Sequence, residues 1–109
     1  MNKAEAIVLC GDVLTEIDVL RGSLFPGIPA RKKLDEYRDI IDKKQLELVD
    51  LAFNENTEKY KIISTELKNI NKEIKGTIQD ITKVADTFET LSRLVTVLDQ
   101  LLMIAVSVA

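Results

Sequence analysis

The sequence predicts an all-α protein, built as an antiparallel helical bundle or a coiled-coil-like rod. Apolar residues recur every three or four positions along most of the chain, which is the period of one face of an α-helix. No segment alternates apolar and polar residues over the length of a strand, and no Asn-Gly or Asp-Gly pair marks a hairpin. The strongest interruption is the proline-containing segment 23–29. We therefore expect a single helical domain over residues 1–109.

Residues 3–22 are predicted to form the first helix. Its apolar side chains make two neighbouring rows, which are Ile7, Cys10, Leu14 and Ile17, and Ala6, Leu9, Val13 and Leu20. Glu5, Asp12, Glu16 and Asp18 mark the side that faces water. Cys10 lies within the apolar face, and no histidine or nearby cationic cluster is present to activate its thiol. We expect Cys10 to be a core residue rather than a reactive one.

The linker 23–29 contains the turn dipeptide Pro26-Gly27 and leads into a second predicted helix over residues 30–53. The apolar residues of that helix recur at helical spacing, at Leu34, Tyr37, Ile41, Leu48 and Leu51 or Ala52. Its first turn is basic, where the helix dipole disfavours cations, and consists of Arg31, Lys32 and Lys33. We expect an ordinary solvated face there, with a docking patch for an acidic partner as the alternative.

Residues 57–105 carry a heptad pattern in which apolar residues recur at alternating intervals of three and four. The positions, of which only Thr77 is not plainly apolar, are Tyr60, Ile63, Leu67, Ile70, Ile74, Thr77, Ile81, Val84, Phe88, Leu91, Val95, Leu98, Leu102 and Ala105. Such a sustained pattern is typical of a helix that packs along a partner helix in a coiled coil. It predicts a third, long helix over residues 57–105, entered through a turn near residues 54–57.

Gly76 is the position at which this long helix could be interrupted. Thr77 could cap a following helix, with Asp80 three residues later as in a capping box. The heptad phase continues through Gly76 without a shift, which favours a continuous helix. That helix would be roughly 73 Å long, too long for a compact globule, and would leave apolar surface for a second copy. A break at Gly76 would instead let four helices close into a bundle.

The last third of the chain has few charges and ends in the uncharged stretch LLMIAVSVA, residues 101–109. One amphipathic helix can shield only one side of such a helix, so its remaining apolar surface predicts an interaction with another molecule. The predicted interaction surface consists of Phe88, Leu91, Leu94, Val95, Leu98, Leu101, Leu102 and Ile104. The expected partner is a second copy, as a dimer or larger homo-oligomer, or a partner helix.

The composition argues against several other classes of protein. The chain has no histidine, one cysteine and no glycine-rich phosphate loop, so we expect no metal, no cofactor and no enzymatic activity. A net charge of −3 weighs against nucleic acid as a partner. A single cysteine suits a reducing compartment, and the N-terminal segment does not resemble a targeting peptide, so a cytoplasmic location is expected.

The sequence therefore predicts a non-enzymatic protein–protein interaction module, such as an adaptor, chaperone or assembly subunit, that self-associates through its C-terminal helix. The first alternative is a membrane-active protein of pore-forming or lytic type, suggested by the uncharged tail, although that segment is short and poor in Lys and Arg. The second alternative is a small acidic inhibitor or immunity-type protein. Its candidate acidic surface would be Asp35, Glu36, Asp39, Asp42, Glu47 and Asp50.

Overall fold

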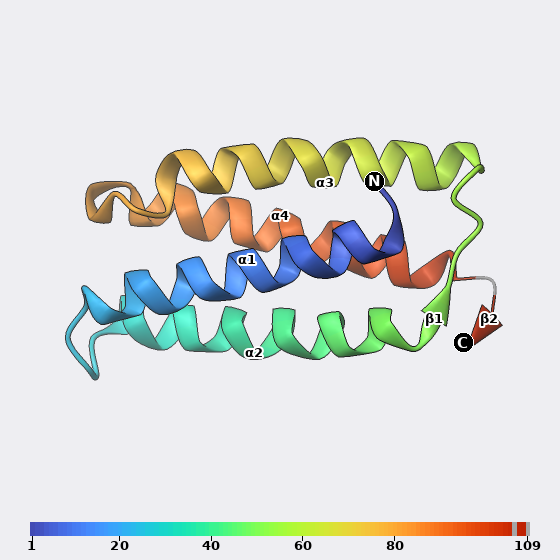
Figure 1. Cartoon of the computed structure of the whole chain (residues 1–109). Helices are drawn as coiled ribbons and strands as arrows, with labels where there is room; N and C mark the ends of the chain where they lie inside the picture. Colours follow the sequence, from blue (N-terminus) through green and yellow to red (C-terminus); the bar gives the residue numbers. More distant parts are fainter. Residues whose placement is uncertain (106, 109) are drawn as a thin grey trace.

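The computed structural model describes residues 1–105, 107 and 108, and these residues form four α-helices (Figure 1). The helices are α1 (Lys3–Gly22), α2 (Pro29–Val49), α3 (Glu58–Thr77) and α4 (Val84–Met103). Two short strands, β1 (Leu51–Ala52) and β2 (Ser107–Val108), and one 3₁₀ helix, η1 (Ile81–Lys83), complete the described chain. The predicted all-α class is confirmed, and the predicted number of three helices is wrong. Val106 and Ala109 of the predicted apolar tail lie outside the described residues.

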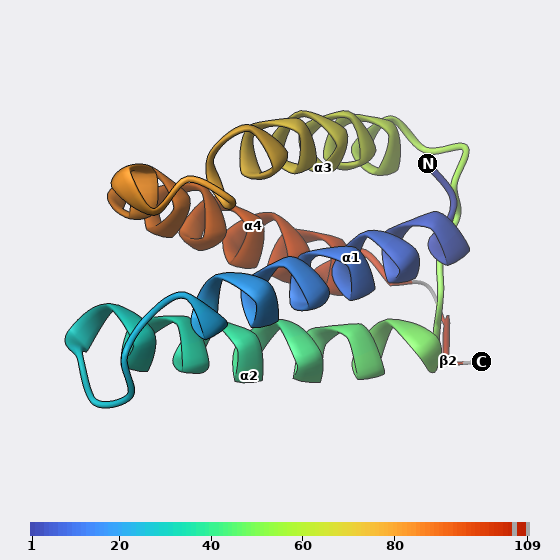
Figure 2. The same ribbon diagram turned by 60° about the vertical axis from the view of Figure 1, so that its left-hand side comes forward.

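The four helices lie side by side, and each runs in the opposite direction to the one before it (Figures 1 and 2). α1 packs against α2, α3 against α4, and α2 against α4, whereas α1 and α3 touch over a much smaller area. The longest dimension of the molecule is 43 Å and its radius of gyration is 14.2 Å. A continuous helix over residues 57–105 would exceed that dimension, so the predicted rod is wrong.

α1 has the bounds that the sequence predicts, because a capping box fixes its start. The side chain of Asn2 accepts a hydrogen bond from the backbone N–H of Glu5 (2.8 Å), and the Glu5 carboxylate accepts one from the Asn2 N–H (3.3 Å). Both bonds satisfy N–H groups that a helix start leaves without partners. Both predicted apolar rows of α1 face the core, and seven of the eight side chains are buried, with Ile7 partly buried against the core.

The linker turns at Phe25–Ile28, with Pro26 and Gly27 at its two central positions. The N–H of Ile28 donates to the carbonyl of Phe25 (3.4 Å), and Gly27 has a φ of +87°. This is the arrangement of a type II turn, in which the third residue needs the backbone freedom of glycine. Pro29, predicted to belong to the linker, is instead the first residue of α2, a position where its missing N–H costs nothing.

Replacing Gly27 with alanine is expected to lower the free energy of unfolding by about 1 kcal/mol, because an L side chain disfavours positive φ. The matched control is Gly76→Ala within α3, which is expected to raise that free energy by up to about 1 kcal/mol. A Cβ atom at either position would meet nothing within 4 Å, so packing does not obscure the comparison. Urea denaturation followed by circular dichroism measures both, and equal effects of the two substitutions would contradict the turn assignment.

α2 ends at Val49, so the predicted continuation of this helix to residue 53 is wrong. The ammonium group of Lys3 donates hydrogen bonds to the carbonyls of Val49 (3.0 Å) and Leu51 (2.7 Å). Leu51 and Ala52 then pair with β2 in an antiparallel register, Leu51 opposite Val108 and Ala52 opposite Ser107. The backbone groups of this segment therefore find partners outside a helix. Each strand has only two residues, which is too short for an alternating apolar and polar pattern to predict it from the sequence.

α3 begins where the sequence predicts a turn, and ends near the alternative break at Gly76. The hydroxyl of Thr57 accepts a hydrogen bond from the N–H of Tyr60 (3.2 Å) and caps α3. Thr77 is the last residue of α3 rather than the cap of the next helix, since its hydroxyl donates back to the Glu73 carbonyl (3.3 Å). Asp80 caps η1 by accepting from the Thr82 N–H (3.0 Å). The predicted pairing of Thr77 and Asp80 in a capping box is therefore wrong.

The turn between α3 and α4 shifts the phase of the apolar pattern. In α3 the predicted heptad residues from Tyr60 to Ile74 are all buried. In α4 the buried stripe moves to one side of the predicted row, and consists of Thr87, Thr90, Leu91, Leu94, Val97, Leu98 and Leu101. Val84, Phe88, Val95 and Leu102 of the predicted row lie at the edge of the core instead. A hydrogen bond from the Thr87 hydroxyl to that of Thr77 (3.1 Å) joins the two helices near the turn.

Candidate interaction surfaces

The predicted interaction surface on α4 is not assembled as a surface in this chain. Leu91, Leu94, Leu98 and Leu101 are at most 2% exposed and belong to the core of the chain itself. A partner cannot contact these four side chains in the folded molecule, and this corrects the predicted surface. The other four members, Phe88, Val95, Leu102 and Ile104, are partly buried and pack against the core.

Phe88 is occupied by contacts between α2 and α4. Its ring stacks on that of Tyr37, with 6.2 Å between ring centroids and 25° between their planes. The ammonium group of Lys33 lies 5.0 Å from the centroid of the Phe88 ring, which is a cation–π contact. Phe88 therefore acts mainly as a packing residue between two helices of the same chain.

An apolar groove of about 280 Å³ lies between the first turns of α3 and the last turn of α4. It is lined by Lys59, Ile62, Ile63, Gln100, Met103 and Ile104. Ile62 is 57% exposed and Met103 is 83% exposed, although both are large apolar side chains. This groove retains Ile104 from the predicted surface and adds residues of α3. We call it the α3/α4 groove.

The sequence pattern did not identify the α3 side of this groove. The heptad row passes through Tyr60, Ile63 and Leu67, and Ile62 falls outside it. Helical periodicity places Ile62 on the solvent side of α3, where it is indeed exposed. An isoleucine at a position where the pattern demands a polar residue is the signal that could have indicated this surface.

Toward the middle of the molecule the space between α3 and α4 becomes polar. A second groove, of about 340 Å³, shares Gln100 with the α3/α4 groove and is lined largely by polar side chains such as Glu66, Asn69 and Thr96. Arg93 of α4 also lines this groove and forms an ion pair with Glu73 of α3. The solvent-exposed apolar part of the space between α3 and α4 thus lies at the end of the helix pair that carries Met103.

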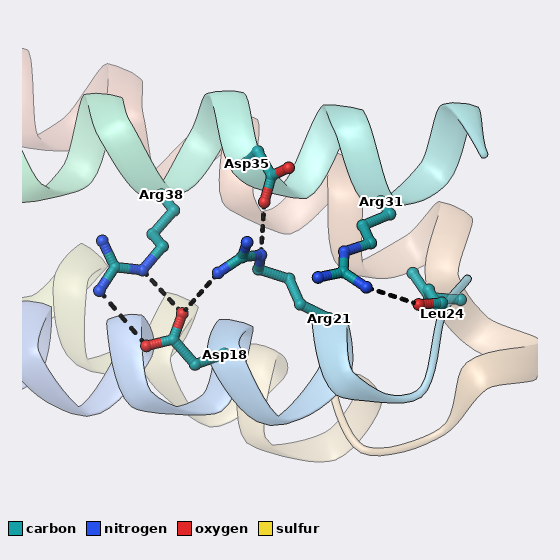
Figure 3. Close-up of polar contacts among 6 residues, drawn as sticks. All are labelled: Asp18, Arg21, Leu24, Arg31, Asp35 and Arg38. Carbon is teal, nitrogen blue, oxygen red and sulfur yellow. Dashed lines mark hydrogen bonds and ion pairs between the residues drawn. The ribbon is translucent and has the colours of Figure 1, made fainter. Parts of the chain in front are cut away.

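Charged side chains of α1 and α2 form a network at the linker end of the molecule (Figure 3). Asp18 accepts hydrogen bonds from Arg38 Nε (2.7 Å) and Arg21 Nη1 (3.3 Å), and Arg21 also pairs with Asp35. Hydrogen bonding from Arg38 is the largest cause that holds the pKa of Asp18 below its ordinary value. These groups are substantially exposed, so the network adds little to the stability of the fold.

Two residues of the predicted basic patch at the start of α2 already have partners within the chain. Arg31 donates a hydrogen bond from Nη1 to the carbonyl of Leu24 (3.1 Å) and so fixes the linker (Figure 3). Lys33 lies over the ring of Phe88, and Lys32 is exposed. Of the candidate acidic surface, Asp35 is paired with Arg21. These contacts favour the interpretation of the α2 surface as an ordinary solvated face.

The chemistry of individual side chains points to structural roles. Cys10 is fully buried, and its burial raises the pKa of the thiol from 9.0 to about 12, which keeps it protonated and unreactive at neutral pH. Among the described residues, no group of three or more His, Cys, Asp or Glu side chains is placed to hold a metal ion. Within the same residues, every helix is too short or too polar to cross a membrane.

No protein-family model, curated protein or solved structure matches this chain. A function must therefore be argued from the surface of the molecule, where the α3/α4 groove is more apolar than the polar groove that adjoins it.

Proposed function

We propose that this protein is a non-enzymatic helical interaction module, such as an adaptor, chaperone or assembly subunit, that binds a protein partner through the C-terminal end of α4. The observation that supports this most directly is the α3/α4 groove, in which Ile62, Met103 and Ile104 offer apolar surface to solvent. Exposed apolar surface that is grouped around a concavity is typical of a binding site rather than of an inert surface.

The shape and chemistry of the groove fit a helix or an apolar segment of a protein. The groove lies between two helices, and apolar side chains of a partner helix recur every three or four residues and can enter such a space. Lys59 and Gln100 at its rim can bind polar groups of the partner. The predicted partners, a second copy of the chain or a helix of another protein, both meet these requirements.

Site-specific photocrosslinking tests this proposal in the native host. A benzophenone amino acid at Met103 is expected to give crosslinked products, and the matched control is the same group at Lys43, an exposed position on α2. A product containing two copies of the chain supports self-association at this site, and a product with another protein supports partner binding. Equal products from both positions, or none from Met103, would overturn the proposal.

Two further features belong to the proposal. The single buried thiol of Cys10 suits a reducing compartment, so we place the protein in the cytoplasm. The absence of histidine from the sequence supports a binding function rather than a catalytic one, because imidazole is the commonest general base at neutral pH.

A further inference from the structure

The contact between α1 and α3 contains two buried acceptor atoms that lack a hydrogen-bond donor. Glu16 lies on the side of α1 that faces α3, since the charge of Lys75 of α3 acts on it. Asn71, one turn before Lys75, faces α1 and lines a groove of about 360 Å³ together with Asp12. Oε2 of Glu16 and Oδ1 of Asn71 are both shielded from solvent, and neither accepts a hydrogen bond from any residue that the structure describes. The contact therefore has an excess of acceptors, and each unpaired acceptor weakens it.

Burial and two neighbouring charges determine the protonation state of the Glu16 carboxyl. Burial has the largest effect and raises the pKa of Glu16 above its ordinary value of 4.5. Lys75 attracts the carboxylate from α3 without forming an ion pair with it among the described residues, and Asp12, one turn earlier on α1, repels it. Asp18 lies two residues after Glu16, on another side of the helix, and pairs with Arg38 of α2. The side of α1 that faces α3 is thus a poor environment for a charged carboxylate.

The contact between α1 and α3 is also small, because α1 packs mainly on α2. A small apolar contact contributes little free energy that could offset a buried charge without a hydrogen-bond partner. We propose that this contact is an acid-sensitive element of the fold, weakened while Glu16 is ionised and strengthened when Glu16 takes up a proton. The proton removes the charge, and the resulting O–H group supplies a donor where acceptors are in excess. The proposal does not rest on the α3/α4 groove.

The pH dependence that follows has the opposite sign to that of a carboxylate in an ion pair. The folded chain protonates Glu16 at a higher pH than the unfolded chain, so between the two pKa values the folded state binds more protons. The contribution of Glu16 to stability therefore rises as the pH falls toward 4.5. Asp18 behaves in the opposite way, because hydrogen bonding from Arg38 holds its pKa below its ordinary value of 3.8, and its contribution is lost only as the pH falls below that value. The two effects occupy different pH intervals.

Urea denaturation of the full chain, followed by circular dichroism between neutral pH and pH 4.5, tests the proposal. The variant Glu16→Gln has no charge at this position and supplies an amide donor. It is expected to have a higher urea midpoint than the wild type at neutral pH, and the difference is expected to shrink as the pH falls. The matched control is Glu66→Gln, at an exposed position on the side of α3 that faces α4, and it is expected to leave the midpoint unchanged throughout.

Titration of the Glu16 carboxyl carbon by NMR locates the effect at the contact with α3, and the missing resonance in Glu16→Gln identifies the signal. Lys75 is exposed, and Lys75→Met is expected to raise the pKa of Glu16 further because the substitution removes an attractive charge. A Glu16 that titrates at or below its ordinary pKa would overturn the proposal. So would a titration that Lys75→Met leaves unchanged, or a Glu16→Gln variant that is no more stable than Glu66→Gln at neutral pH.

Discussion

Replacing Leu98 with alanine is expected to lower the free energy of unfolding by about 2–5 kcal/mol, because the substitution leaves a cavity in a packed core. Leu98 is 0% exposed and lies in the buried stripe of α4. The sequence pattern alone placed this residue on a surface for a partner. Urea or thermal unfolding at constant protein concentration measures the effect.

The matched control is Met103→Ala, on the same helix but 83% exposed. It is expected to change the free energy of unfolding by less than about 0.5 kcal/mol, since exposed side chains contribute little to folding. If Leu98→Ala left the stability unchanged and reduced the affinity for a partner, Leu98 would be a surface residue. The packing of α4 described above would then be wrong.

Raising the pH from 9 to 12 is expected to destabilise the protein through Cys10. The pKa of this thiol is raised from 9.0 to about 12 by burial, so in this interval the unfolded chain loses a proton that the folded chain keeps. The folded state then binds more protons, and stability falls with rising pH by about 1.4 kcal/mol per pH unit. Below pH 9 this group has no effect. Urea denaturation at a series of pH values measures the slope.

Tyr60 adds to the same effect above pH 10, because burial raises its pKa from 10.0 to about 12. The variant Cys10→Ala separates the two groups. It is expected to lose the slope between pH 9 and 10 and to keep a slope above pH 10. An unchanged slope between pH 9 and 10 in Cys10→Ala would show that another group is responsible.

The first helix could be predicted residue by residue, because its start and its inner face depend on local chemistry. Asn2 and Glu5 form a capping box within one turn, and the apolar rows through Leu9 and Ile17 match the period of a helix. The turn at Gly27 could likewise be predicted from the dipeptide Pro26-Gly27 alone. These features need no information from distant parts of the chain.

The break between α3 and α4 could not be predicted with the same certainty, because the heptad phase continues through Gly76. Folding back at that point buries Ile78, which is 1% exposed, and leaves Ile81, a member of the predicted row, 48% exposed. The competing arrangements differ in tertiary packing rather than in local propensity. The end of α2 is a similar case, since Lys3 and β2 act on it from distant positions in the sequence.

The candidate surfaces depended on this same tertiary information. The apolar side chains of the last third of the chain lie on α4, but the sequence could not distinguish a side chain covered by α1–α3 from one covered by a partner. Leu94 and Leu98 belong to the first kind and Met103 is left exposed. Ile62 could not be identified in this way, because it is a single apolar residue on an otherwise polar face of α3.

The narrow contact between α1 and α3 divides the molecule into two helical hairpins, α1–α2 and α3–α4, which are joined chiefly where α2 packs on α4. Contacts within each hairpin connect residues close in sequence, so each hairpin can form early and quickly, and their docking completes folding. Partial opening requires the least free energy along the small α1–α3 contact, with the α2–α4 contact as the hinge. Such an opening exposes the inner apolar row of α1 while the helices of both hairpins keep their backbone hydrogen bonds, so probes of apolar side-chain exposure are expected to detect it before exchange of the helical amide protons does.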